Sequence, residues 1–513
     1  MNWKKWLKYT AIFLFLLISI SLIWITREGK RMYGGLTEQV DYKQFKPQEG
    51  SFAIKNINVL SPDGDSIISK QTVLIEKGLI TAIDSTLNLS SKTKVIDGSG
   101  KYLIPGLIDT HVHLFQSPND LLLYVANGVT EIRELIGEKN HLKWRKQIED
   151  GRIGPKMFVA SPRLGSFESM EGWFMSWSQG YLNIKNAKEA RKTVKRLYDE
   201  GYNGIKIYSQ LTKESYLAII ETANSLGMPV FGHIPWSLEL NDVWTNGQSG
   251  IAHFEELMNA LSREFSSNRN IGSFYGNEDD FLKFAEERCE DLANNLIQND
   301  IAITSTLWLT ESFAKQPFDI HQVLKDVELE YENPGISEWV NYVPQGLGWL
   351  PEVNRYKLPE NQTADERKRS KKYWETYAKG CQILARNLAK RGVTIMTGTD
   401  ANLPPAVPGF SLHDELQSLH RSGMSTAQVL KSATRIPAER LKSNSGKISP
   451  GYIANLIMLE KNPLENIANT KTINTVINKG QVFDRSLLDS ILASVKDANN
   501  SSRKINIDTF LTK

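Results

Sequence analysis

The chain has 513 residues, of which 23% are charged and 41% apolar, and its formal net charge is +3. This composition is ordinary for a folded protein with one large or several smaller domains, and the near-neutral charge excludes the basic footprint of a nucleic-acid-binding protein. The only cysteines, Cys289 and Cys381, are too few for a disulfide framework or a thiolate zinc site. We expect two free thiols, with a single disulfide between them as the alternative.

The first 27 residues differ from the rest. Three lysines precede an uncharged run over residues 9–26, whose length lies between that of a signal-peptide core and that of a membrane-spanning helix. No small-residue cleavage site follows the run, so the pattern favours an uncleaved signal-anchor over 1–27. We expect a membrane-anchored protein whose body lies outside the cytoplasm, in the periplasm or the extracellular space. Secretion after cleavage is the alternative.

Two β-type segments stand at opposite ends of the chain. After a linker over 28–50, residues 51–102 contain short alternating strands separated by turn residues, and a similar pattern returns over 441–485. Because they flank one long middle segment, we expect them to form a single small β-sandwich. The remaining residues, 486–513, are expected to be a C-terminal tail.

The middle of the chain, 103–440, alternates short apolar strands with helical stretches. Such alternation predicts a parallel sheet, and eight units predict an α/β fold closed as a (β/α)8 TIM barrel. Two aromatic-rich stretches, 163–185 and 258–375, exceed ordinary connections and are expected to be insertions that act as lids or binding elements. The eight expected strands lie within 107–114, 128–135, 156–162, 204–209, 229–234, 250–256, 301–307 and 393–400.

His111 and His113 are separated by one residue on the first expected barrel strand. Side chains at positions i and i+2 of a strand share a face, so both imidazoles point into the barrel. Two converging neutral imidazoles suit a divalent metal ion. Taken alone, however, the pair favours two hydrogen-bonded histidines in a core over a metal site.

Four further residues favour the metal site over a buried pair. They are spread over four other expected strands, and each stands at or near the end of its strand: Lys206, His233, His253 and Asp400. The carboxyl ends of barrel strands form the face on which barrel enzymes build their active sites. The coincidence of all six residues at this face predicts a metal centre.

Lys206 allows several interpretations. A lysine that points into a barrel is costly unless it is paired or modified. An ion pair with Asp400, or an extension of the side chain to the rim, would satisfy it without chemistry. A third interpretation is that the neutral amine, favoured by desolvation, captures carbon dioxide as a carbamate.

These motifs resemble those of a known family. The segment LIPGLIDTHVHL resembles the opening signature of the amidohydrolase superfamily, and the order of the six residues is similar to its binuclear subtype. The segments GVTEIREL, GYNGIKIY, TGTDAN and SGKISPGYIANLIMLEKNPLEN resemble its imidazolonepropionase-like and prolyl-dipeptidase-like branch. The resemblance covers about 51 to 485, with one departure at Asn455, where the family usually carries Asp.

The resemblance implies a binuclear hydrolase of carbon–nitrogen bonds. Lys206 would be carbamylated and would bridge two divalent cations, with zinc the expected metal. His111, His113 and Asp400 would hold the buried cation, whereas His233 and His253 would hold the exposed one. A hydroxide between the two cations would attack the carbonyl, and Asp400 would carry the proton to the leaving nitrogen. Dipeptides, N-acyl amino acids and cyclic amides are all candidate substrates.

Three residues are weaker candidates for substrate contacts. Tyr208 shares a strand face with Lys206, Arg163 follows the third strand, and His413 follows the eighth. For His413 a helix cap or a surface role is the favoured alternative. The remaining histidines, His141, His321 and His420, are expected on helix surfaces.

Three alternatives remain open. The first is a mononuclear deaminase or cyclic-amide hydrolase of the same superfamily, in which Lys206 stays a free lysine. The second is a catalytically inactive scaffold, which all six retained positions disfavour. The third is a membrane-bound protein that binds its ligand without turnover. A small molecule or short peptide is the expected partner, with a homo-oligomer also open.

Overall fold

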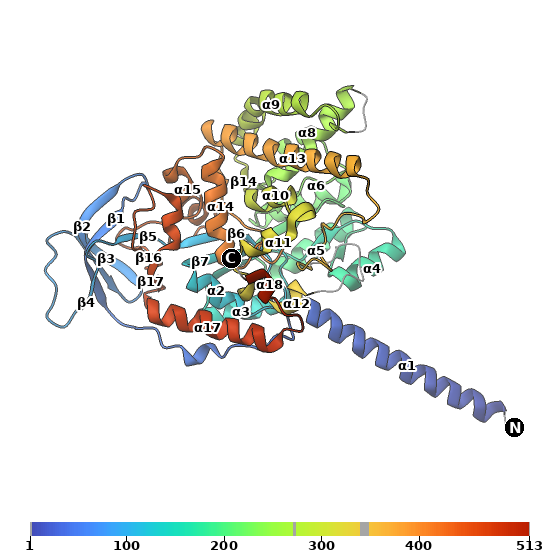
Figure 1. Cartoon of the computed structure of the whole chain (residues 1–513), viewed down its shortest axis with the longest axis horizontal. Coiled ribbons are helices and arrows are strands. Elements are labelled where there is room, and N and C mark those ends of the chain that lie inside the picture. Colours follow the sequence, from blue (N-terminus) through green and yellow to red (C-terminus); the bar gives the residue numbers. More distant parts are fainter. Residues whose placement is uncertain (1–2, 270–272, 339–347, 512–513) are drawn as a thin grey trace.

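The computed structural model describes residues 3–269, 273–338 and 348–511 and shows an α/β, TIM-barrel-like body, an extra β-sheet and a projecting N-terminal helix (Figure 1). Neighbouring barrel strands pair in parallel, as expected for strands linked by helices. The barrel strands are β6 (Leu107–Val112), β7 (Val129–Glu134), β8 (Lys156–Val159), β11 (Ile205–Ile207), β12 (Val230–Gly232), β13 (Gly250–Ala252), β14 (Ala302–Thr304) and β15 (Ile395–Met396).

Two isolated bridges complete the circuit of strands. Ala160 pairs with Gly204, which joins β8 to β11, and Val112 pairs with Ala401, which joins β6 to the segment after β15. All eight expected strands therefore take their places in chain order around one ring. The helices that follow them on the outside include α2 (Asp120–Ala126), α3 (Lys139–Glu149), α5 (Ala187–Asp199), α6 (Lys213–Ser225), α7 (Leu240–Thr245), α8 (Phe254–Arg269) and α14 (Phe410–Arg421).

The extra sheet is assembled from both ends of the chain. Its path runs β18-β17-β16-β5-β1-β2-β3, with β4 paired to β1, and β5 and β16 form the antiparallel junction of its two halves. Apolar side chains from both halves share one cluster. The bounds are β1 (Phe52–Leu60), β2 (Ile67–Glu76), β3 (Leu79–Asp84), β4 (Lys94–Asp97), β5 (Tyr102–Pro105), β16 (Leu456–Leu459), β17 (Ile473–Asn478) and β18 (Gln481–Asp484).

Asn455 lies at the junction of this sheet with the barrel. Its side-chain Oδ1 accepts a hydrogen bond from the backbone N–H of Lys479 at 2.7 Å, and its carbonyl accepts one from Gly106 at 2.8 Å. An amide oxygen accepts such a bond as a carboxylate does. The departure from Asp at this position therefore leaves a hydrogen bond between the side chain of Asn455 and the turn at Lys479.

Both segments expected to be irregular are packed parts of the structure. Within the expected linker, Phe45 is buried in the main core and Gln48 bridges to Val482. The expected tail forms α17 (Arg485–Ser502), which packs on α2, and α18 (Asp508–Leu511). Apolar residues spaced along one face of α17 explain this packing, because Leu488, Ile491 and Val495 are all buried.

The two aromatic-rich insertions are mostly helical. The first contains β9 (Leu164–Gly165), α4 (Ser169–Gln179) and β10 (Leu182–Asn183). The second carries α9 (Glu278–Gln298), α10 (Leu307–Phe313), α11 (Gln316–Lys325), η2 (Leu329–Tyr331), α12 (Pro334–Ser337) and the start of α13 (Ala364–Lys390), while its residues 339–347 lie outside the described residues. The two cysteines are buried free thiols, as expected.

Helix α1 (Trp3–Met32) projects from the body (Figure 1). Within Trp6–Met32, the most apolar window of 18 residues has a mean hydropathy of 2.2, and no part of this window is buried. By length and composition this helix could cross a membrane, and a signal sequence has the same properties.

Candidate metal centre at the barrel mouth

Six side chains from five strands meet at one end of the barrel. His111 lies in β6, and His113 directly follows this strand. Lys206 lies in β11, and Asp400 follows β15. His233 and His253 directly follow β12 and β13. All except His233 are buried, and Lys206 is completely so. The parallel ring of strands brings together residues that are 289 positions apart in the chain, as in the pair His111 and Asp400.

The carboxylate of Asp400 lies at the centre of this group. Its Oδ1 is 3.1 Å from Nε2 of His111 and 2.7 Å from Nε2 of His113. Ligand atoms of His111, His253 and Asp400 all lie within 4.8 Å of one another. The His233 ring follows at 5.5 Å from that of His253, measured between centroids. Imidazole and carboxylate donors converging at this range suit a divalent transition metal.

Buried polar atoms in this group lack the partners that a folded protein normally supplies. Among the described residues, no hydrogen bond reaches Nζ of Lys206, either ring nitrogen of His111, Nδ1 of His113 or Oδ1 of Asp400. Leaving a buried donor or acceptor unsatisfied costs about 1–3 kcal/mol. A cation bound among these atoms would use their lone pairs, so the side chains present fit a metal.

Hydroxyl groups orient two of the histidines. Nδ1 of His253 lies 2.7 Å from Oγ1 of Thr306, and Nδ1 of His233 lies 2.8 Å from Oγ of Ser209. When a ring donates its Nδ1–H to such a hydroxyl, the lone pair on Nε2 is left for a metal.

Backbone strain also collects here. His253 and Asp400 adopt left-handed backbone conformations, with φ of 76° and 59°. Residues other than glycine rarely adopt this region, and such strain concentrates at functional sites.

The environment shifts the pKa values of the side chains in this group. Burial lowers the pKa of His253 to about 3 and that of Lys206 to about 7. Burial works to raise the pKa of Asp400, but the adjacent His113, His253 and Lys206 outweigh it and hold this pKa below its ordinary value. His111, His233 and His253 are therefore neutral and Asp400 is an anion. At His113 burial works to lower the pKa, but the adjacent Asp400 and Glu134 outweigh it and raise this pKa.

A cavity of about 790 Å³ opens over the cluster, a size typical of small-molecule sites. Its floor includes His113, His233, His253 and Asp400. Its walls come from the end of α1, the loop after β6, the α4 insertion and the second insertion. Wall residues include Ile25, Met32, Phe115, Trp177, Tyr181, Glu255, Phe313, Arg355, Tyr356 and Trp374.

Two of the three candidate substrate contacts line this cavity. The Tyr208 ring lies 4.6 Å from that of His233, and burial raises its pKa. The Arg163 guanidinium lies 6.0 Å from the Tyr208 ring and donates a hydrogen bond to the carbonyl of Gln179 at 2.6 Å. Their roles in binding stay predictions.

The structure does not bring His413 to the cavity. It is buried at the opposite end of the barrel, with Nδ1 at 2.9 Å from the hydroxyl of Thr470 and Nε2 at 3.1 Å from the carbonyl of Asn127. Both ring nitrogens of His413 have hydrogen-bond partners within the protein, and the residue does not line the cavity, so it is not a substrate contact. The expectation for His141 was also wrong, since this residue is buried and its Nε2 lies 2.7 Å from the carbonyl of Phe115.

Three charged residues of the cavity were missed from the sequence. Glu255 and Glu256 follow His253 directly, and burial raises their pKa values to about 7 and about 8. Oε1 of Glu256 lies 3.3 Å from Nδ1 of His233. Their position next to an expected ligand was a usable signal, whereas nothing distinguished Arg355 within its long insertion.

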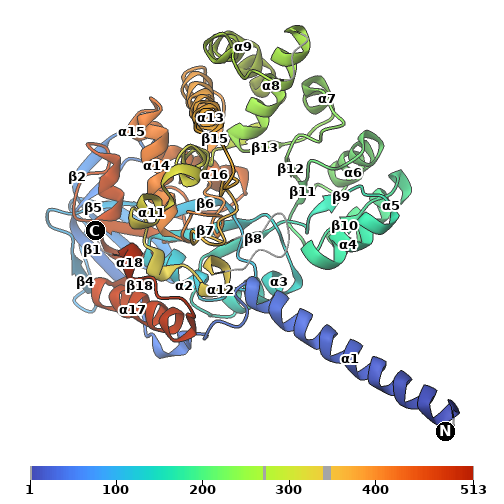
Figure 2. The ribbon, with the colours of Figure 1, turned by 45° about the vertical axis from the view of Figure 1, so that its right-hand side comes forward.

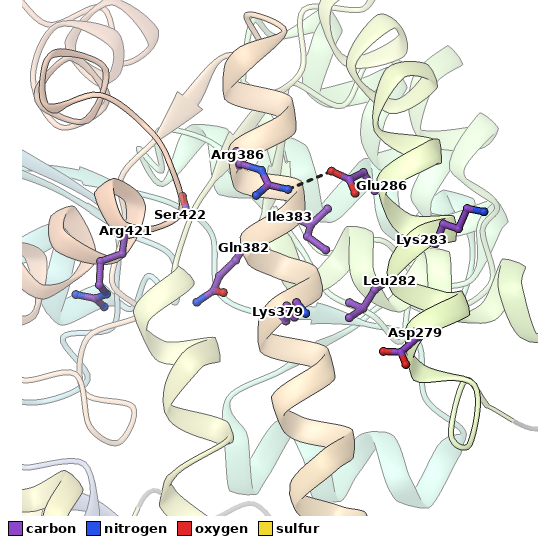
Figure 3. Close-up of a pocket in the computed structure, with 10 residues that line it drawn as sticks. All are labelled: Asp279, Leu282, Lys283, Glu286, Lys379, Gln382, Ile383, Arg386, Arg421 and Ser422. Carbon is purple, nitrogen blue, oxygen red and sulfur yellow. Dashed lines mark hydrogen bonds and ion pairs between the residues drawn. The ribbon is translucent and has the colours of Figure 1, made fainter.

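A second hollow, of about 430 Å³, lies on the surface between α9, α13 and the end of α14 (Figure 3). Its charged groups are exposed and several are paired, as Arg386 is with Glu286 at 3.1 Å. Exposed pairs of this kind are ordinary surface features. The hollow lacks the buried, unpartnered donors of the barrel mouth.

Comparison with known proteins finds a family match over part of the chain. The model of the amidohydrolase family matches residues 348–483, which include Asp400. A solved Xaa-Pro dipeptidase with methionine in its active site is 18% identical, covers 85% of this chain and 100% of its own, and superposes with a TM-score of 0.59. The chain therefore resembles the amidohydrolase family over residues 348–483 and shares the fold of this structure over most of its length.

The curated relatives that the chain matches include deaminases. A 5'-deoxyadenosine deaminase of Methanosphaera stadtmanae is 26% identical over 161 residues, which are 31% of this chain and 33% of the relative. This match thus spans about a third of that relative's length. A 5-methylthioadenosine/S-adenosylhomocysteine deaminase of Thermococcus kodakarensis is 22% identical over 467 residues, covering 84% of this chain and 94% of the relative.

Proposed function

We propose that this protein is a metal-dependent hydrolase of amide or peptide-like carbon–nitrogen bonds, acting on a dipeptide, an N-acyl amino acid or a cyclic amide. The observation that carries the proposal is the group of buried, unpartnered ligand atoms beneath the cavity, on His111, Lys206 and Asp400 above all. A cavity open to solvent over such a group is the arrangement of a catalytic rather than a structural metal site.

The six residues divide into two sets in this proposal. His111, His113 and Asp400 would hold a buried cation, and His233 and His253 an exposed one, with zinc the expected metal. When bound, such cations supply Lewis acidity to the scissile carbonyl and to the attacking water.

Lys206 would join the two sets as a carbamate. Its Nζ is buried and unpartnered 5.4 Å from the ring of Tyr208, a residue of the cavity wall, and a charged ammonium there is unfavourable. The neutral amine attacks carbon dioxide, an N–C bond forms, and the released proton leaves with solvent. The resulting carboxylate gives the site a bridging ligand.

The chain's own groups perform the remaining tasks. Asp400 is ionised, so it can accept a proton from water and return it to the leaving nitrogen. Arg163 and Arg355 both line the cavity and could pair with a substrate carboxylate. The Tyr208 hydroxyl would donate a hydrogen bond to the substrate.

A mononuclear deaminase is the second candidate, and the similarity to deaminases over most of the chain favours it. In that case Lys206 stays an amine and the site holds one cation. Metal content separates the two candidates, because two equivalents per chain support the binuclear hydrolase and one opposes it.

The decisive experiment measures activity and metal together. The full chain, purified in detergent and loaded with zinc, is assayed against dipeptides, N-acyl amino acids, cyclic amides and adenosine-type nucleosides. Amide hydrolysis that chelation abolishes and zinc restores supports the proposal. Ammonia release from nucleosides alone, or tight ligand binding without turnover, contradicts it.

The proposed division of the chain follows the sheet and barrel described above. Residues 1–27 form a membrane anchor, 103–440 the metal-binding barrel, and 51–102 with 441–485 the additional β-domain. We place the barrel outside the cytoplasm. Extraction of membranes with alkaline carbonate tests the anchor, since a spanning helix keeps the protein in the pellet.

A further inference from the structure

The body end of α1 forms part of the wall of the metal-site cavity. Six consecutive or near-consecutive residues at this end line it: Ile25, Thr26, Gly29, Lys30, Met32 and Tyr33. The backbone carbonyl of Tyr33 accepts a hydrogen bond from the N–H of Gln116 at 2.9 Å, three residues after His113. The apolar helix is therefore built into the site rather than tethered at a distance.

An apolar track continues from α1 to the metal ligands. Met32 and Tyr33 pack in one cluster with Phe115, Ile136 and Tyr208. The Tyr208 ring in turn lies 4.6 Å from His233. A substrate lying along this track would keep an apolar portion on α1 while its polar end reached the ligand histidines.

Helix α4 presents an unusual apolar surface beside this opening. Met170, Trp173 and Trp177 are 86%, 69% and 53% exposed, and Phe174 is also exposed. The rings of Trp173 and Trp177 stack with their centroids 6.0 Å apart. Contiguous exposed apolar groups of this kind mark an interaction surface, and tryptophan is enriched where proteins meet the membrane interface.

The α4 surface and α1 lie on the same side of the barrel (Figure 2). The Tyr33 hydroxyl donates a hydrogen bond to the carbonyl of Ser178 at the end of α4, at 3.5 Å, and Trp177 lines the same cavity as Ile25. The uncharged run of residues 9–26 is about 27 Å long at about 1.5 Å per residue, close to the thickness of a bilayer core. A bilayer spanned by this run would have its surface at Ile25–Thr26, level with the cavity mouth.

We propose that α4 seats its apolar face in the interface of the bilayer that α1 spans, and that the site takes amphiphilic amides whose long acyl chain leaves the bilayer along the α1 track. This rests on the proposed amide hydrolysis. Basic Arg27, Lys30 and Arg31 at the end of α1 stand where lipid headgroups would lie. In this proposal lipid covers the apolar face of α4. The alternative that the experiment must exclude is contact with a second copy of the chain.

The first test measures where α4 lies. The full chain is placed in phosphatidylcholine–phosphatidylglycerol nanodiscs with a spin label at Met170→Cys or Trp173→Cys, and Ile297→Cys on α9 is the control. Cys289 and Cys381 are buried and leave the introduced thiol as the reactive one. Ile297 is 51% exposed and belongs to α9, a helix that lies away from α1 across the barrel (Figure 1).

We expect the α4 labels to be reached by oxygen but shielded from a water-soluble nickel chelate, and the Ile297 label to be reached by both. Free access of the chelate to α4 would overturn the proposal. Dipolar broadening between α4 labels, or protection from both reagents, would assign this face to a second copy and would also overturn it. So would a mature chain that lacks α1 by mass spectrometry.

The second test separates the substrate class from the basic activity. N-acetyl and N-dodecanoyl derivatives of one amino acid are compared in nanodiscs, with Trp173→Ser and Ile297→Ser as matched variants. We expect kcat/KM for the dodecanoyl amide to exceed that for the acetyl amide by ~10-fold or more, since more apolar surface is buried on binding. Trp173→Ser should reduce this preference and leave the acetyl amide rate unchanged.

Equal rates on both amides would contradict the inference while leaving the proposed hydrolysis intact. Zinc-dependent turnover of neither amide would count against the proposed function, and the label accessibilities would still report on the membrane seat of α4.

Discussion

The two ends of the barrel treat buried histidines in opposite ways. At the carboxyl ends of the strands, His111 is buried with neither ring nitrogen hydrogen-bonded, and its neighbours point their lone pairs at the same space. At the other end, His413 is equally buried, but a hydroxyl and a carbonyl satisfy both of its nitrogens. Burial and residue type are the same at both ends, so the unmet hydrogen-bonding capacity is what separates a ligand from a packing residue.

This contrast also explains the charges around each end. The cluster at the mouth combines the neutral imidazole of His253 with the anionic Asp400, a pair that gains from a cation. Around His413 the nearby charges Asp414 and Lys471 pair with each other at 2.8 Å and leave the imidazole neutral. Metal removal should therefore change the structure at the barrel mouth and leave the surroundings of His413 unchanged.

The largest expected effect is that of Asp400→Asn at the barrel mouth. The amide keeps the shape of the side chain but cannot take a proton, so we expect kcat to fall by about 10²–10⁴-fold while much of the zinc stays bound. Turnover with a chromogenic N-acyl amino acid and elemental analysis measure the two effects.

Asp414→Asn is the matched control for this variant. Asp414 lies at the other end, on α14, and pairs with Lys471 on the surface side. Its variant should keep nearly full activity. Near-normal activity of Asp400→Asn would remove the assigned proton-transfer role.

His413→Gln tests the buried histidine that lies away from the metal cluster. Burial lowers the pKa of His413 to about 3, below the value of 6.5 for an unperturbed histidine. The unfolded chain therefore binds more protons than the folded chain between pH 6.5 and pH 3. The stabilisation that the neutral imidazole contributes is present above pH 6.5 and is lost as the pH falls, by up to about 1.4 kcal/mol per pH unit.

The measurement is urea unfolding of zinc-free protein at several pH values. At pH 7 the variant should be less stable by about 1–3 kcal/mol, since it loses buried hydrogen bonds. The gap between the two proteins should narrow toward pH 4. A gap that is constant with pH would show that His413 titrates normally in the folded state, and zinc loss in the variant would contradict its separation from the metal site.

Much of this arrangement could be predicted from the chain alone. The barrel strands are short apolar runs at regular intervals, and the parallel topology puts their ends at one rim, so the convergence of His111, His253 and Asp400 followed from their positions. Periodicity and strand order carry this information locally, and each expected strand was found.

Side-chain partners could not be predicted in the same way. His413 and His141 occupy helices with polar neighbours in sequence, yet Thr470, Asn127 and Phe115 approach them from distant segments. The role of α1 as a cavity wall was equally hidden, because its apolar run signals a membrane and carries no information on what its last turn contacts.

Thr306→Val tests the smallest of these effects, the support of a single ligand. The Thr306 hydroxyl lies 2.7 Å from Nδ1 of His253 and fixes the ring with Nε2 toward the cluster. Without this hydrogen bond the ring loses its orientation, and we expect zinc affinity to fall by about 10–100-fold, measured by competition with a chelator.

Thr310→Val is the matched control, because the Thr310 hydroxyl donates to the backbone carbonyl of Thr306 at 3.2 Å and not to a ligand histidine. Thr306→Ser should restore affinity, since it returns the hydroxyl; if it fails to do so, the side-chain volume of Thr306 rather than its hydrogen bond supports the mouth. In that event packing rather than a hydrogen bond would orient His253 at the barrel mouth. His253 would then not differ in this respect from His413, a packing residue.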